Sequence, residues 1–182
     1  AYFDFTGADL SHADLDHSSL RNADLTDAIV THTNFNNADL WGVDLSGKDL
    51  TGTVLTGADL TDVNLDGVDL SDKDLTNANL SRVDLSDKDL SGIILTGAFL
   101  SSTNLSGVNL YGMDLTNANL SGVDLSDKDL TGTVLIGADL TDANLQGISL
   151  SGKDLSGTIL SGVDLSDKDL TGTVLIGADL TD

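Results

Sequence analysis

The hydrophobic and polar residues of this chain repeat with a period of five. Leu stands at positions 5, 10, 15 and onward to 180, and only Phe5, Val30 and Phe35 replace it. No Leu occurs elsewhere. We call these positions central. Two residues before each central position is its inner slot, and one residue before it is its outer slot. Two residues after it is its corner. The register never slips, so the pattern predicts one uninterrupted repeat domain over residues 1–182.

A period of five fits neither a helix nor a straight strand. On an α-helix every fifth residue rotates by about 140°, which scatters the central residues around the cylinder. In a strand an odd period places successive central residues on opposite faces. They can share one interior only if the chain turns after every pentapeptide. All 19 Gly lie at corners, where Gly, Asn and Asp tolerate a left-handed backbone, and four such corners close a coil of twenty residues.

Individual repeats resemble the A(D/N)LXX motif of the pentapeptide-repeat family. Good examples are residues 58–62 (ADLTD), 78–82 (ANLSR) and 118–122 (ANLSG), and the resemblance covers essentially the whole chain. It implies an all-β solenoid, a right-handed quadrilateral parallel β-helix in which the central and inner-slot side chains point inward. Twenty residues per coil would give about nine coils and a rod on the order of 44 Å long, at about 4.8 Å per coil.

The composition excludes several classes of function. The chain has 30 acidic residues against 8 Lys and Arg, with a net charge of -22, and it contains no Cys. Disulfide scaffolds and thiolate zinc sites are therefore excluded. A polyanion repels phosphates, which argues against direct binding of nucleic acid, and no apolar run is long enough to span a membrane. The sequence predicts no cofactor and a partner that is either another protein or a second copy of this chain.

A second period of 40 residues appears in the lysines, all of which occupy inner slots. Lys48, Lys88, Lys128 and Lys168 are spaced by 40, and Lys73 and Lys153 by 80. Bare ammonium groups in a core would cost several kcal/mol each. We therefore expect these side chains to cross the wall, with their heads in solvent or at the neighbouring Asp carboxylates. The array stops in the middle of a 40-residue unit, which is consistent with a segment of a longer array.

The 40-residue unit also predicts an apolar contact stripe on the outside of the coil. The outer slots hold Val54, Ile94, Val134 and Val174, and Ile136 and Ile176 lie on neighbouring outward positions. We call these six residues the lateral contact stripe. Recurrence on one face favours lateral association. The alternative is a set of exposed β-formers that the surface tolerates.

Catalysis has little support in the sequence. No His follows position 32, so the abundant Ser and Thr of the later repeats lack a base to activate them. The Asp residues are expected on a solvated wall, where nothing raises one pKa above another. His12 and His32 are twenty residues apart and should stack, but two His make an incomplete ligand set. A solvated corner is favoured over a weak site for a divalent cation, and Asp ladders would attract Ca²⁺ only loosely. We predict no catalytic residue and no dedicated metal site.

Three functions remain open. The favoured one is a structural scaffold, an acidic rod that associates laterally or end to end in a filament or assembly. The family resemblance supplies the alternative, a DNA mimic that binds a type II topoisomerase such as gyrase and confers quinolone resistance. A charge of -22 over that length is one charge per about 2 Å, against one per about 1.7 Å in duplex DNA. Family members of that type usually have a Phe-rich centre, a protruding loop and a C-terminal dimerisation module, which this sequence lacks.

The third function is an ice- or mineral-binding surface. It is suggested by the Thr-Gly-Thr segments at 51–53, 131–133 and 171–173. Their spacing skips alternate coils, which weakens the match to a flat lattice.

Overall fold

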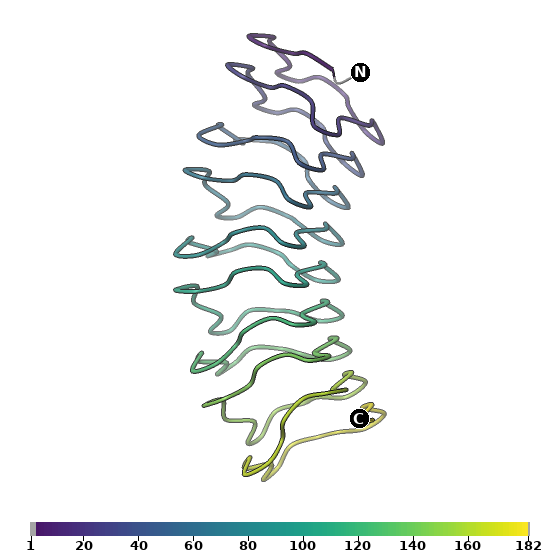
Figure 1. The fold of residues 1–182 in the computed structure, drawn as a ribbon, viewed down its shortest axis with the longest axis vertical. Coiled ribbons are helices and arrows are strands. Elements are labelled where there is room, and N and C mark those ends of the chain that lie inside the picture. The colour runs from purple at the N-terminus through teal and green to yellow at the C-terminus, as the bar shows by residue number, and fades with distance from the viewer. Residues whose placement is uncertain (1–2, 182) are drawn as a thin grey trace.

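A computed structural model describes residues 3–181 of the chain, which stack as successive coils in one elongated rod with the termini at opposite ends (Figure 1). Within that range the structure has no helix, and its strands are reduced to isolated parallel β-bridges. Each bridge pairs outer-slot residues twenty positions apart, such as Asp39 with Asp59 and Asn119 with Asp139. The coil length of twenty residues that the sequence predicts is confirmed.

Every corner has a left-handed backbone. From residue 7 to residue 177, each corner has a φ between 51° and 73°, whether it is Gly or another residue. The central carbonyl before the corner accepts a hydrogen bond from the next inner-slot N–H, as in the 3.0 Å bond from Ala58 N to Leu55 O. The residue between the central position and the corner has a negative φ, so each turn is a type II β-turn. This confirms the corner positions predicted from the sequence.

The core consists of the central residues with the small inner-slot residues between them. Phe35, Leu40 and Ala58 are fully buried, and each central Leu contributes roughly 1.5–3 kcal/mol by burial. Four inner-slot threonines, Thr33, Thr103, Thr133 and Thr158, are buried as well, and their hydroxyls donate to main-chain oxygens. Thr103 Oγ1 donates to the carbonyl of Leu80 at 2.9 Å, 23 residues earlier in the preceding coil.

Two opposite faces of the rod differ in how the coils are joined. We call the column of central residues 20, 40 and onward to 160 the Leu40 face, and the column of 10, 30 and onward to 170 the Leu50 face. On the Leu40 face every central N–H donates to the next coil at 2.7–2.8 Å, as Leu40 does to Asp59 O. On the Leu50 face only Leu10 does so, to Ile29 O at 2.9 Å. Among the described residues, the other central N–H groups of that face donate no hydrogen bond to a main-chain oxygen of the next coil.

The missing bonds form discrete openings between successive coils. We name each opening by its residues in the upstream coil. Every opening lies on the Leu50 face and also extends onto one adjoining face. Successive openings extend onto the two adjoining faces in turn. Along the described chain no main-chain hydrogen bond joins adjacent coils at the openings 25–30, 50–55, 65–70, 90–95, 105–110, 130–135 and 145–150. Openings on the same adjoining face recur every 40 residues, which is also the period of the sequence.

Each opening faces a long, unbranched side chain in the inner slot of its downstream coil. In chain order these residues are Lys48, Lys73, Lys88, Met113, Lys128, Lys153 and Lys168. From residue 8 onward, all other inner slots hold Ala, Ser, Thr, Val or Ile. An extended side chain does not fit in the space that Ala or Val fills, so it lies between the coils and holds them apart. The openings therefore follow from the residue type at one position of the repeat.

Candidate interaction surfaces

The walls of the rod carry Asp in most outer slots, and local hydrogen bonds lower the pKa of several of these carboxylates. Asp154 Oδ1 accepts hydrogen bonds from the main-chain N–H of Ser156 at 2.9 Å and from its hydroxyl at 2.5 Å. The hydroxyl, followed by the N–H, holds the pKa of Asp154 below its ordinary value of 3.8. The pKa values of Asp69 and Asp164 are lowered in the same way by Ser71 and Ser166.

Few of these charges are neutralised by ion pairs. Between residues 3 and 181, the pairs within 4.0 Å are Arg21 with Asp39, Arg82 with Asp62, and His17 with Asp16. Arg82 lies on an exposed corner and bonds Asp62, one coil earlier, through two of its nitrogens at 2.9 and 2.6 Å. Exposed pairs of this kind contribute little to stability, because solvent screens them. The rod therefore presents a predominantly negative surface.

The lysines end in the openings and not at carboxylates. Lys88 Nζ donates to the main-chain oxygens of Leu65 at 2.7 Å and Val68 at 3.2 Å, both in the preceding coil. Lys48, Lys128, Lys153 and Lys168 also donate to carbonyls of their preceding coils. No Lys within the described range forms an ion pair with Asp. We expected these heads in solvent or at the neighbouring carboxylates; the carboxylates are not their hydrogen-bond partners, because the openings leave main-chain carbonyls free to accept.

Lys73 is the exception among the six. No protein acceptor within the described residues takes a hydrogen bond from its ammonium group. Its charge does act on a nearby carboxylate. The pKa of Asp69 is lowered first by the hydroxyl and the N–H of Ser71 and, to a smaller extent, by Lys73.

The six residues of the lateral contact stripe all lie on the outside of the rod. The four outer-slot members, Val54, Ile94, Val134 and Val174, are 37–46% exposed. Ile136 is 38% exposed and Ile176 is 76% exposed. Between the outer-slot members stand Asp74, Asp114 and Asp154, which bridge to Ile94, Val134 and Val174 respectively. The stripe is therefore an alternating column of apolar and acidic side chains.

The predicted stack of histidines is present at one column of corners. The rings of His12 and His32 are 4.8 Å apart between centroids and 18° from parallel. In the part of the chain that the structure describes, no three His or Asp side chains come together so that they could hold a metal ion. His17 lies at a different corner, with Nε2 3.7 Å from Asp16 Oδ1.

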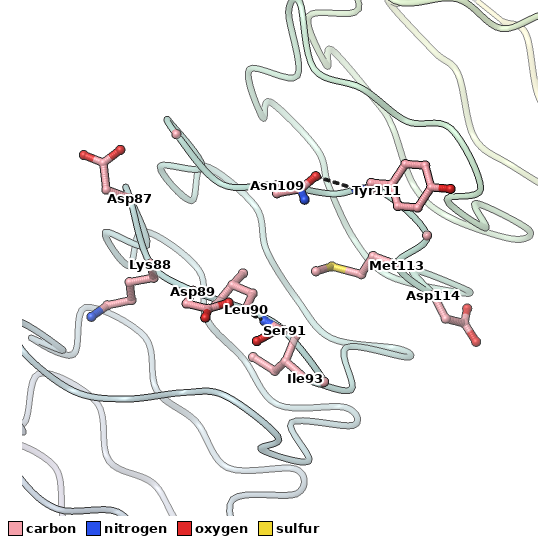
Figure 2. A pocket seen from close by; sticks show the side chains of 13 residues that line it. Asp87, Lys88, Asp89, Leu90, Ser91, Ile93, Asn109, Tyr111, Met113 and Asp114 are labelled. Atoms are coloured by element: carbon pink, nitrogen blue, oxygen red, sulfur yellow. Dashed lines mark hydrogen bonds between the residues drawn. The ribbon is translucent and has the colours of Figure 1, made fainter.

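A cleft on the rod coincides with opening 90–95. Its volume is about 560 Å³, and it lies between the segment of Asp87 to Ile93 and the segment of Asn109 to Asp114. Figure 2 shows Met113 extending from its coil toward the segment of Leu90, whereas Lys88 is directed away toward the opposite side. The sequence analysis missed this site. Its signal was available, because Met113 stands 40 residues after Lys73 and 40 before Lys153.

Comparison with known proteins identifies the repeat. A family model described as pentapeptide repeats in eight copies matches the chain at residues 4–42, 33–72, 74–112, 114–152 and 154–182. This chain belongs to the pentapeptide-repeat family. The fold of this pentapeptide-repeat protein is the all-β, right-handed quadrilateral parallel β-helix that its sequence predicts. No curated protein matches the sequence.

Two solved structures illustrate what this chain is similar to. A trypsin-treated variant of QnrB1, a plasmid-mediated fluoroquinolone resistance protein, is 23% identical over 100% of this chain and 91% of its own, with a TM-score of 0.63. HetL of the cyanobacterium Nostoc, a pentapeptide-repeat protein involved in regulating heterocyst differentiation, is 31% identical over 97% of this chain and 82% of its own, with a TM-score of 0.33. At these levels of similarity QnrB1 supports the fold alone. Among residues 3–181 there is no helix with the length and hydropathy of a membrane span.

Proposed function

We propose that this pentapeptide-repeat protein is a non-enzymatic scaffold, an acidic rod that associates with further copies of itself laterally through its contact stripe. The observation that carries the proposal is the exposure of Val54, Ile94, Val134 and Val174 on one column with a period of 40 residues. Ile136 and Ile176 widen the apolar surface at the neighbouring corner. Burial of such side chains against a second rod would contribute about 25 cal/mol per Å² of apolar surface.

The charge of the rods sets the conditions for this association. Each copy carries a net charge of -22, so two rods at low ionic strength repel each other. At about 0.15 M salt the Debye length falls to about 8 Å, and the short-range apolar contact can then exceed the repulsion. Lateral association should therefore strengthen as salt is added.

End-to-end association is the second mode of assembly in this proposal. Near the C-terminal end of the described chain the central residues Leu170 and Leu180 are 36% and 51% exposed, whereas Leu160 is buried. A further coil stacked on this end would cover them and pair the open strand edge. Electron microscopy separates the two modes, because lateral association gives rafts of parallel rods and axial association gives filaments one rod wide.

The test of the lateral mode is sedimentation velocity in low and moderate salt. The variant that replaces both Ile94 and Val134 by Asp should remain monomeric under conditions where the natural chain associates. Ile29→Asp is the matched control, because Ile29 is a 50% exposed outer-slot residue outside the stripe. A natural chain that stays monomeric at high concentration in both salts would overturn the lateral mode.

A non-enzymatic role agrees with the chemistry of the walls. The carboxylates of Asp69, Asp154 and Asp164 have lowered pKa values and are exposed to solvent, whereas a general acid needs a raised one. The cleft at opening 90–95 lacks His and Cys. Nothing at these positions supplies an activated nucleophile.

The alternative function is a DNA mimic that binds a type II topoisomerase. Two observations favour it: the negative charge of the rod, and the likeness of its fold to QnrB1, a fluoroquinolone resistance protein. A gyrase supercoiling assay tests it with and without a quinolone. Protection or inhibition at stoichiometric amounts of the rod supports the mimic, and unchanged supercoiling at a large excess of rod argues against it.

A further inference from the structure

In opening 90–95 Met113 stands where both counterparts have Lys, and Ile93 stands where both have Thr. Openings 50–55, 90–95 and 130–135 occupy the same face at intervals of 40 residues, and their inner slots hold Lys73, Met113 and Lys153. The same inner-slot position therefore holds Lys in two of these openings and Met in the third. A thioether has the length to hold the coils apart, but it has no hydrogen to donate.

An ammonium group fits this kind of opening, as Lys153 and Lys88 demonstrate, whereas the ammonium group of Lys73 bonds neither carbonyl of its own opening. Lys153 Nζ donates to the main-chain oxygen of Leu130, which also accepts the turn hydrogen bond, and to that of Thr133 at 3.3 Å. Lys88 makes the same pair of contacts in opening 65–70, to Leu65 and Val68. Two carbonyls of the upstream coil, three residues apart, therefore form the acceptor pair for one ammonium group.

In opening 90–95 the equivalent acceptors are Leu90 O and Ile93 O. Leu90 O accepts only the turn hydrogen bond from Ile93 N, at 3.2 Å. Ile93 O accepts no hydrogen bond from any described residue. Each oxygen keeps a free lone pair, and both residues line a cleft of about 560 Å³. The acceptor pair is present, and its donor is missing from the chain.

The other residues that line the cleft are also complementary to an alkylammonium ion. Leu90, Ile93 and Met113 provide an apolar lining beside the carbonyls, and Asp87, Asp89 and Asp114 supply negative charge around them (Figure 2). The main-chain N–H of Ser91 leads the groups that hold the pKa of Asp89 below its ordinary value, so that carboxylate is ionised at neutral pH. An aliphatic stem and a cationic head would therefore both find complementary surroundings.

We infer that opening 90–95 binds a primary alkylammonium group. The N–H groups of this ligand donate to Leu90 O and Ile93 O, as the ammonium group of Lys153 does to the equivalent carbonyls, because Met113 has no N–H to donate. The ligand class comprises the side chain of a partner protein's lysine and the end of a free diamine. This site adjoins the lateral contact stripe at Ile94 and Asp114, but its acceptors are main-chain oxygens and it does not depend on self-association.

The experiment is a titration of the isotopically labelled chain followed by amide NMR, with n-butylammonium as the probe. Shifts should concentrate at residues 89–93 and 109–114 and saturate with the added ligand. Tetramethylammonium carries the same charge without an N–H donor, and it should bind about tenfold or more weakly because two charge-assisted hydrogen bonds are lost. Equal shifts from both cations, spread along all the acidic columns, would overturn the inference.

Two reciprocal variants make the test specific. Met113→Lys supplies the chain's own ammonium and should abolish the local shifts, while leaving the spectrum of distant coils unchanged. Lys153→Met should create a second site, with new shifts at Leu130 and Thr133. Binding that survives Met113→Lys, or a Lys153→Met variant that folds without gaining a site, would contradict the assignment. Folding of each variant is checked by its own spectrum before the titration.

A final comparison separates the two sources of the ammonium group. N-acetyl-lysine N-methylamide represents a protein lysine, and 1,4-diaminobutane represents a free diamine. Tighter binding of the lysine derivative points to a protein partner, and tighter binding of the diamine points to a small polyamine. Failure of both to shift residues 89–93 would overturn the site itself.

Discussion

The ammonium nitrogen of Lys88 lies 2.7 Å from the main-chain oxygen of Leu65, 23 residues earlier and one coil upstream. The hydroxyl of Thr103 bears the same relation to Leu80 at 2.9 Å. Both inner-slot donors thus reach a central carbonyl of the preceding coil. The two side chains differ in length. Thr103 fits between coils that are hydrogen-bonded to each other, whereas the longer Lys88 lies at an opening.

We predict that shortening Lys88 closes its opening. In Lys88→Val the side chain matches Val68 and Val108, which occupy the same inner-slot column, so the coils can approach. The N–H of Asp89 should then donate to Val68 O, and its hydrogen exchange should slow by about tenfold or more. Amide exchange followed by NMR or mass spectrometry measures this change.

Lys88→Met is the control that separates length from charge. Met113 already holds opening 90–95 without an ammonium group, so Lys88→Met should leave the exchange of Asp89 fast. If Lys88→Val left the Asp89 amide exchanging as in the natural chain, the long side chain would not be the cause of the opening.

Two glycines at corners provide a matched pair for stability. Gly107 and Gly112 have φ values of +71° and +69°, so Ala is strained at both by about 1–2 kcal/mol. A Cβ on Gly107 would lie 1.9 Å from Asp87 Oδ1, whereas a Cβ on Gly112 would meet nothing within 4 Å. Gly107→Ala should therefore lower the free energy of unfolding by about 1–3 kcal/mol more than Gly112→Ala. Chemical denaturation measures both, and equal losses would show that the Asp87 side chain moves without cost.

Removing a buried hydroxyl should have a smaller effect. Thr133 Oγ1 donates to Leu110 O at 2.7 Å, and this oxygen also accepts the turn hydrogen bond from Met113 N at 3.1 Å. Because the carbonyl keeps one partner in Thr133→Val, the free energy of unfolding should fall by only about 0.5–1.5 kcal/mol. Thermal unfolding monitored by circular dichroism tests this, and a loss above that range would mean that the carbonyl is not satisfied by the turn alone.

The stability of the rod should depend on pH through its local Asp hydrogen bonds. The pKa of Asp154 is lowered when the chain folds, first by the hydroxyl of Ser156 and then by its N–H. A lowered pKa contributes stability above the ordinary value of 3.8, and this stability is lost as the pH falls through the folded value. Ser156→Ala should raise the pKa of Asp154 toward its ordinary value, as carboxyl ¹³C NMR can measure. In Ser151→Ala the pKa should stay unchanged, because the Ser151 hydroxyl donates to Thr171 O instead.

Much of the fold follows from local residue chemistry and could be predicted from the sequence. Leu at every fifth position places the core, and Gly, Asn and Asp two residues later permit the positive φ of a type II turn. The 20-residue coil follows because four such turns bring the chain back onto itself. The exposed column of Val54, Ile94, Val134 and Val174 could also be located from its spacing, although its role as a contact stays a proposal.

The openings could not be predicted in this way. Whether two coils approach to hydrogen-bonding distance depends on how an inner-slot side chain of one coil fits against the carbonyls of another, 20–23 residues away. The expectation for the lysines considered the neighbouring Asp residues in sequence, whereas the ammonium groups of Lys88 and Lys153 bond carbonyls of the preceding coil. Met113 drew no attention in the sequence, because its significance depends on the acceptors of Leu90 and Ile93 that face it.

The sequence by itself thus determined which residues form the core, the wall and the corners, because those roles depend on residue type within a single pentapeptide. Only the tertiary structure decided where the coils separate and which polar groups lie free between them. The physical reason is that hydrogen bonds between coils require two main chains to meet at about 2.7–3.2 Å, and one long side chain between them is enough to prevent it.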